Sequence, residues 1–115
     1  MAFNLFMKRQ YRIRKNEEFS SIIGNKKSVS DACFVLYFED KKEAYARIGV
    51  SVSKKLGNAV VRNKIKRQVK EMAKQLVDFD NYPKDLIIIV RKAYLDKDFI
   101  YNKNHLELLI KKAII

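Results

Sequence analysis

The stretch SVSKKLGNAVVRNKIKRQVKE, residues 51–71, contains the end of a strand, a tight turn and the start of a helix. The residues before Lys54 alternate between polar and apolar side chains, as in a half-buried strand. Gly57 then allows an unusual backbone angle, and Asn58 is a residue type that caps helix N-termini. The stretch therefore predicts a strand followed at once by a helix that runs to about Val77.

This predicted helix has one apolar side and one cationic side. At about 100° per residue, its apolar residues fall within an arc of about 80°; they are Val61, Ile65, Val69, Met72 and Leu76. The neighbouring arc of about 140° is almost entirely basic; it holds Arg62, Asn63, Lys66, Arg67, Lys70 and Lys74. Only Lys64 lies clearly elsewhere. Between residues 54 and 74 the chain has eight Lys or Arg and a single acid, Glu71.

Such a helix is mildly destabilised by its own charges. Each pair of like charges four residues apart costs a few tenths of a kcal/mol, and the positive helix N-terminus disfavours Arg62 and Lys64. A row of phosphates would turn these unfavourable charge interactions into favourable ones. Lys54 and Lys55 also flank a bend that leads into unpaired helix N–H groups, which is a ready anion site. Because a merely solvated helix face usually mixes both signs, the pattern predicts a phosphate-binding surface.

The composition supports a polyanionic partner. The chain has 115 residues, with 25 basic against 13 acidic and a formal net charge of +12, which favours nucleic acid or an anionic membrane face. No apolar stretch approaches the ~18 residues of a membrane span, and the basic helix lacks the Phe or Trp that interfacial helices favour. A basic domain without such a partner is the alternative, which the clustering of the charges disfavours. We expect one RNA-binding domain over residues 1–115, with residues 1–10 as a flexible basic arm.

The start of the chain also bears on where the protein acts. MAFNLFMKRQYRIRK, residues 1–15, places apolar residues before basic ones, the reverse of a secretory signal. The single Cys33 fits a reduced compartment and excludes an internal disulfide. We therefore expect the protein to remain in the cytoplasm, without a membrane partner and with no protein partner evident.

The remaining pattern predicts an α+β fold with one small sheet and helices packed on it. Asn16 should cap a first helix, with Gly24 as its left-handed stop, and a last helix should run from about Asp98 to Ala113. The predicted strands are CFVLYFED (33–40), YARIGVSVS (45–53) and the buried central LIIIVRK (86–92). We expect the first two of these to form an antiparallel hairpin, and the loop before Cys33 could add one short strand. The order is helix, strand, strand, helix, strand, helix, apart from that extra strand.

The strand at 33–40 is apolar on both faces, so its outward residues allow two interpretations. Val35 and Tyr37 either belong to an ordinary core or lie on an open face, where Tyr37 could stack on unpaired bases. A basic helix set between strands suits a folded RNA backbone better than it suits the base-reading helix of a DNA-binding module. The sequence therefore favours RNA.

The acidic residues show no arrangement for catalysis. Eight of the 13 occur as scattered pairs at residues 17–18, 39–40, 78 and 80, and 96 and 98, outside the basic stretch. Hydrolytic nucleases need paired carboxylates that hold a metal, or a histidine that acts as base, and His105 has no apparent partner. We predict no catalytic residue and no metal site in this chain, which should cut nothing alone.

The quoted stretch resembles the signature of the bacterial ribonuclease P protein subunit. Members carry a Lys-Lys pair, then Gly-Asn-Ala-Val, Arg-Asn and Ile-Lys-Arg, and all are present here in order. The resemblance extends from about Tyr11 to Ala113 and includes YRIRKNEEF, FVLYF and DLIIIVRK. It implies a partnership with a catalytic RNA that supplies the active site and holds Mg²⁺, and together they remove the 5′ leader of precursor tRNA. It also implies a left-handed β-α-β crossover, which spacing could not show because the default hand is the opposite one.

The resemblance implies two sets of site residues. The surface for the catalytic RNA comprises Lys54, Lys55, Asn58, Arg62, Asn63, Lys64, Lys66, Arg67 and Lys70. The leader-binding cleft comprises Phe19, Val35, Tyr37 and, as a weaker candidate, Arg91. Members of the family often have Arg at Lys64 and a second aromatic residue at Ile23, so stacking at Ile23 is not expected. The alternative function is a general RNA-binding or ribosome-associated structural protein without a processing role.

Overall fold

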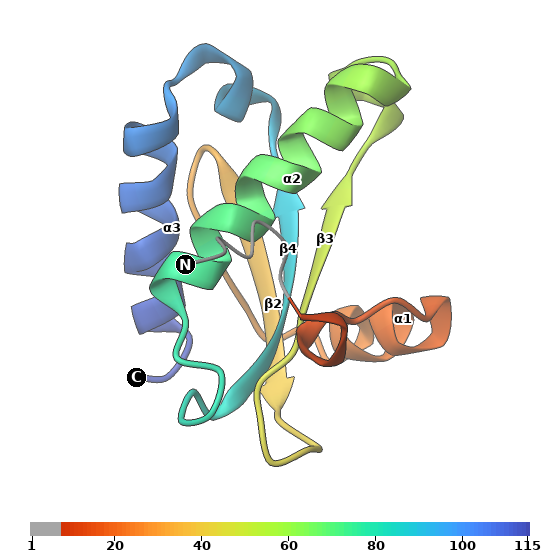
Figure 1. The fold of residues 1–115 in the computed structure, drawn as a ribbon, viewed down its shortest axis with the longest axis vertical. Helices are drawn as coiled ribbons and strands as arrows, with labels where there is room; N and C mark the ends of the chain where they lie inside the picture. The colour runs from red at the N-terminus through yellow and green to blue at the C-terminus, as the bar shows by residue number, and fades with distance from the viewer. Residues whose placement is uncertain (1–7) are drawn as a thin grey trace, which may run out of the picture.

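Three helices pack on one four-stranded sheet (Figure 1). A computed structural model describes residues 8–115, so most of the predicted basic arm lies outside the described residues. The helices are α1 (Asn16–Gly24), α2 (Ala59–Leu76) and α3 (Phe99–Lys112). The strands are β1 (Ser28–Ser30), β2 (Phe34–Asp40), β3 (Ile48–Val52) and β4 (Lys84–Val90). Three short 3₁₀ turns are η1 (Arg9–Tyr11), η2 (Lys54–Leu56) and η3 (Lys92–Asp96). The α+β prediction is confirmed, and the extra strand before Cys33 is β1.

The strand order β1-β2-β4-β3 shows that the predicted hairpin of β2 and β3 is wrong. β4 lies between these two strands, antiparallel to β2 and parallel to β3. The reason is that β4 is apolar on both faces, and such a strand is most stable at the centre of a sheet with both faces covered. Asp85 also holds the start of β3 against β4, because its Oδ1 accepts the Arg47 N–H at 2.9 Å.

The β3-α2-β4 unit has the rare left hand. In Figure 1 the chain rises along β3, descends through α2 in front of the sheet and rises again along β4, to the left of β3. Almost all such crossovers between parallel strands are right-handed. The crossover that the resemblance implied is therefore present.

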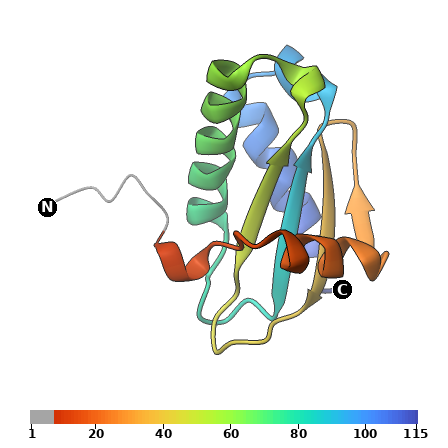
Figure 2. The ribbon, with the colours of Figure 1, turned by 90° about the vertical axis from the view of Figure 1, so that its right-hand side faces the viewer.

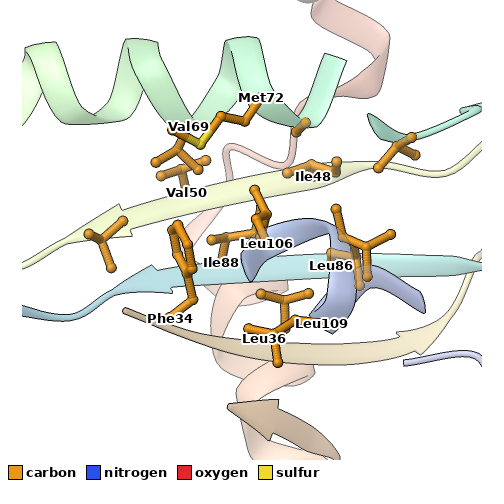
Figure 3. Packing of buried hydrophobic residues seen from close by; sticks show 14 of the residues in the cluster. Phe34, Leu36, Ile48, Val50, Val69, Met72, Leu86, Ile88, Leu106 and Leu109 are labelled. Carbon is orange, nitrogen blue, oxygen red and sulfur yellow. The ribbon is translucent and has the colours of Figure 1, made fainter. Parts of the chain in front are cut away.

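The main core lies between the sheet and the two longer helices (Figure 3). It contains Phe34, Leu36, Ile48, Val50, Leu86 and Ile88 from the strands, Val69 and Met72 from α2, and Leu106 and Leu109 from α3. The predicted apolar side of α2 is buried at Ile65, Val69 and Met72 and half-buried at Leu76, whereas Val61 is 37% exposed. Burial of this side fixes the cationic side of α2 toward the outside.

Helix α1 crosses the opposite face of the sheet, as Figure 2 shows. There a smaller cluster of Ile13, Ile22 and Ile87 is buried, with Phe19 and Tyr37 packed against it. The predicted ends of α1 need correction. Its N-cap residue is Lys15, not Asn16, and Gly24 lies within the helix. The left-handed residue is Lys26, with φ 59°, because the chain turns only after the helix has ended.

The predicted cap of α2 is confirmed, and α3 begins with a cap at Asp98, where its start was predicted. The Asn58 side chain accepts the Val61 N–H at 3.0 Å at the start of α2. The Asp98 side chain accepts the Tyr101 N–H at 2.8 Å at the start of α3. Gly57, before Asn58, has φ 150°, a value that L side chains rarely adopt. No helix of residues 8–115 is long and apolar enough to cross a membrane.

Candidate nucleic-acid interface

The cationic side of α2 carries no carboxylate partner. The six ion pairs found within residues 8–115 use none of the Lys or Arg between residues 54 and 74. Arg67 is exposed, whereas Arg62, Lys66 and Lys70 are half-buried. Glu71, the only acid in this stretch, accepts a hydrogen bond from Gln75 at 3.1 Å. The positive charge of this side is therefore not neutralised by neighbouring acids.

The turn before α2 adds two exposed lysines on an ordered backbone. Lys54 and Lys55 are exposed on η2, where the Ser53 hydroxyl accepts the Lys55 N–H at 3.2 Å. Because the amide oxygen of Asn58 caps α2, only its amide nitrogen remains free to donate to a ligand. Asn58 thus has a structural role whether or not it also contacts RNA.

Lys64 lies apart from the other predicted RNA-binding residues. It lines a pocket of about 300 Å³ on the side of α2 that faces η3. The other lining residues are Val61, Ile65, Gln68, Tyr94, Leu95 and Lys97. Gln68 belongs to this side because its Oε1 accepts the Tyr94 hydroxyl at 2.8 Å. The nine predicted residues therefore form a main surface plus one outlying lysine.

The predicted cleft residues Phe19, Val35 and Tyr37 lie on the other face of the sheet. The strand register places Tyr37, Ile87 and Gly49 in one row across the sheet. Helix α1 covers this row, and Phe19 lies directly over Gly49. The next row contains Val35, Ile89 and Ser51, all half-buried. We call this second row with Phe19 the apolar shelf. Tyr37 is half-buried beside it, so it belongs neither to the fully buried core nor to an open surface.

Arg91 lies at the end of β4 beyond this shelf and is exposed. Its guanidinium donates to the backbone carbonyl of Asp31 at 2.9 Å, and its N–H donates to the carbonyl of Cys33 at 2.8 Å. A carbonyl orients the guanidinium without cancelling its charge. Arg91 can therefore still bind a phosphate.

The two surfaces meet at the β3 edge of the sheet. A groove of about 500 Å³, which we call the edge groove, runs there between α1 and α2. It is lined by Ile13, Arg14, Asn16, Phe19, Ser20, Val50, Ser51, Val52 and Lys66. Phe19 of the shelf and Lys66 of the cationic side therefore line the same groove, although their elements pack on opposite faces of the sheet.

Arg47 fixes α1 in this position. It bonds Glu18 of α1 at 2.6 Å and the fully buried Asp85 of β4 at 3.2 Å. The hydrogen bond from Arg47 holds the pKa of Glu18 below its ordinary value. Burial raises the pKa of Asp85 against the opposing effect of Arg47. Glu18, next to Phe19 in the chain, is thus already engaged by an arginine.

The prediction from sequence missed Gly49 and Arg14. Gly49 interrupts an otherwise alternating strand, and a glycine inside a strand often marks a close approach by another group. That signal was available. Arg14 carried no such signal, because only the folded segment places it in the edge groove. No group of three or more His, Cys, Asp or Glu able to hold a metal ion occurs in the described part of the chain.

Comparison with known proteins identifies the family. The family model described as Ribonuclease P matches residues 7–114. The ribonuclease P protein component of Mycoplasma capricolum is 44% identical over 107 residues, which cover 92% of this chain and 98% of that protein. The RNase P protein of Staphylococcus aureus superposes with a TM-score of 0.79 at 42% identity, covering 90% of this chain and 94% of that one. The RNase P protein of Thermotoga maritima gives 0.73 at 30% identity, covering 87% and 96%. The residues of the basic turn and helix, the left-handed crossover and these matches agree: the chain belongs to the ribonuclease P protein family.

Proposed function

We propose that this chain is the protein subunit of a ribonuclease P in which a catalytic RNA carries the active site. The cationic side of α2 and its preceding turn bind the catalytic RNA, and the apolar shelf binds the 5′ leader of precursor tRNA. Binding to both promotes Mg²⁺-dependent removal of the leader. The observation that carries the proposal is the edge groove, because Phe19 and Lys66 line it together.

The α2 side suits a folded RNA backbone. Arg62, Lys66 and Arg67 carry charge without a carboxylate partner in the described residues, so phosphates would relieve their mutual repulsion. Their arrangement on one rigid helix gives a fixed spacing of cations. Such a surface recognises the shape and charge of RNA more than its sequence.

The shelf suits a single strand. Val35 and the Phe19 ring offer half-buried apolar area on which an unpaired base can lie, and such stacking tolerates any base. Arg91 at the end of β4 is placed to bind a phosphate of the same strand. A duplex could not present its bases to this surface, so the leader is the expected occupant.

The residues of this chain do not fit a protein-held Mg²⁺ site. Residues 8–115 contain no group of three or more potential metal ligands. We therefore assign Mg²⁺ to the catalytic RNA, and the protein contributes by neutralising phosphates and orienting the leader. Neutralisation lowers the repulsion between two RNA molecules, so less Mg²⁺ should be needed for substrate binding.

Reconstitution tests the proposal. Catalytic RNA, precursor tRNA and this protein are mixed at low Mg²⁺, and cleavage is compared with that by the RNA alone. The expected result is faster cleavage at the 5′ end of the mature sequence. Equal rates would leave only a general RNA-binding role, and specific cleavage by the protein without the RNA would place the active site in this chain.

The Tyr37→Ala variant tests the leader-binding surface separately from the surface for the catalytic RNA. Tyr37 packs against the cluster of Ile13, Ile22 and Ile87 beside the shelf, so its loss should weaken binding of leader-bearing tRNA and spare mature tRNA. Tyr101→Ala, on the exposed side of α3, is the matched control. Equal loss for both tRNAs with the Tyr37 variant would refute the assignment of the leader to this face.

A further inference from the structure

The basic segment that precedes α1 is held in place on the folded domain. The Tyr11 ring stacks on Phe79 with centroids 4.4 Å apart, and the Ile13 N–H donates to the Ile48 carbonyl at 2.9 Å. Ile13 itself is only 4% exposed. The basic side chains on either side of these anchors, and Arg12 between them, therefore project from a fixed backbone next to the β3 edge.

These side chains surround a second groove, of about 310 Å³. It is lined by Arg9, Arg12, Arg14, Lys15 and Glu18. Glu18 is its only acid, and that carboxylate is already bonded to Arg47 at 2.6 Å. Because Arg14 also lines the edge groove, the two grooves adjoin. We call the second one the arginine groove.

Arg12 is incompletely satisfied within the protein. Its Nε is buried and has no hydrogen-bond partner in residues 8–115. Lys70 lies nearby: burial lowers its pKa, and the charges of Arg12 and Lys66 lower it further. A buried donor without a partner is costly, as is the convergence of like charges. An anionic ligand would remove both costs.

We propose that Arg9, Arg12, Arg14 and Lys15 bind the phosphodiester backbone of the 5′ leader where it continues from the edge groove, so that the protein contacts leader nucleotides beyond those on the apolar shelf. This inference rests on the proposed function. Arg14 lines both grooves, so a single RNA strand can pass from the edge groove into the arginine groove. The arginine groove supplies charge and no aromatic ring, so it should bind any leader sequence.

A series of precursor tRNAs, with leaders lengthened one nucleotide at a time, tests the inference. The affinity of each precursor tRNA is measured for the complex of catalytic RNA and protein. The complex contains either the wild-type protein or the double variant Arg12→Gln plus Arg14→Gln. For the wild type, affinity should rise with leader length and then level off. For the variant it should level off at a shorter leader, with about tenfold weaker binding of the longest leaders. The log–log salt slope for these leaders should shrink by about 1.4, as expected for two contacts to a single strand.

The control variant Lys27→Gln plus Lys112→Gln removes the same charge at exposed positions outside both grooves. It should behave like the wild type. Arg14→Gln alone, at an exposed position, gives a second variant if the double variant has a lowered melting temperature.

The outcomes are distinct. Loss confined to long leaders supports the inference. Equal loss at every leader length, with weaker binding of the catalytic RNA alone, would assign the segment to the catalytic RNA and overturn the inference. No change with either variant would also overturn it. If wild-type affinity did not depend on leader length at all, the proposed function itself would fail.

Discussion

Phe19 and Gly49 are in such close contact that no side chain fits between them. A Cβ built on Gly49 would lie 2.5 Å from Cζ of the Phe19 ring and 2.9 Å from Cδ1 of Ile87. Both neighbours are parts of the packed face beneath α1, so neither can move freely. The glycine therefore sets how closely α1 approaches the sheet, and with it the position of the aromatic ring in the edge groove.

Gly49→Ala should displace the Phe19 ring. We expect a loss of about 1–3 kcal/mol in the free energy of unfolding, the usual range for an overpacked site. Binding of leader-bearing tRNA should weaken while mature tRNA is bound as before. Urea denaturation and paired affinity measurements check both effects.

Gly24→Ala is the matched control for this prediction. Nothing lies within 4 Å of a Cβ at Gly24, which ends α1. Because alanine favours the helix, this variant should be neutral or more stable by up to about 1 kcal/mol. If Gly49→Ala behaved like Gly24→Ala, the close contact would not constrain the leader surface.

Arg62→Ala plus Arg67→Ala should weaken binding to the catalytic RNA without unfolding the domain. Neither arginine forms an ion pair with another described residue, so their removal leaves no orphaned carboxylate. The log–log salt slope of binding should shrink by about 2, one for each lost phosphate contact. Filter binding over a range of salt concentrations measures the slope, and thermal melting checks the fold.

Lys27→Ala plus Lys112→Ala serves as the control of equal charge. Both lysines are exposed and lie far from α2 in sequence. If this control lost as much affinity as the arginine variant, net charge rather than the α2 surface would explain binding.

Tyr82→Phe should destabilise the domain and leave RNA binding intact. The Tyr82 hydroxyl donates to the carbonyl of Ile110 at 2.6 Å in the last turn of α3, where helix carbonyls lack partners within the helix. Burial raises the pKa of Tyr82, so the hydroxyl remains a donor. Losing this bond leaves a buried carbonyl unsatisfied, at a cost of about 1–2 kcal/mol.

Tyr101→Phe provides the comparison for Tyr82→Phe. Tyr101 is 40% exposed, so removal of its hydroxyl should change stability by less than about 0.5 kcal/mol. Urea denaturation gives both values. Equal stability of the two variants would show that the Tyr82 bond contributes nothing.

The local structure of α2 was predictable because its signals are local. Asn58 caps the helix as expected, and the apolar residues Ile65, Val69 and Met72 are buried. The pairing of the strands was not predictable in this way. β2 and β3 follow one another in sequence, yet β4 separates them, and that arrangement depends on burial of both faces of β4 rather than on any turn signal. The meeting of Phe19 and Lys66 in one groove likewise depends on how α1 and α2 pack on the two faces of the sheet, which spacing alone cannot indicate.

Glu18→Gln should destabilise the domain at neutral pH and much less in acid. The ion pair with Arg47 holds the pKa of Glu18 below its ordinary value, so the native state binds this proton more weakly than the unfolded chain. The stabilisation is therefore present above the ordinary glutamate pKa and is lost as pH falls through the lowered one. Asp85 has a raised pKa and acts in the opposite direction, but it is retained in both proteins and largely cancels in the comparison.

We expect a difference of about 1 kcal/mol near neutral pH, since Glu18 is partly exposed. Glu17→Gln is the control, because Glu17 lies in the same first turn of α1 and makes none of the ion pairs found in the described residues. It therefore removes the same charge from the helix N-terminus without breaking the bond to Arg47. Urea denaturation of the three proteins over a range of pH gives the comparison. The free energy of unfolding of the Glu18 variant could instead stay below that of the wild type by the same amount down to the most acidic pH. The cause would then be lost packing rather than the charge on Glu18. Arg47 would in that case not fix α1 through this ion pair.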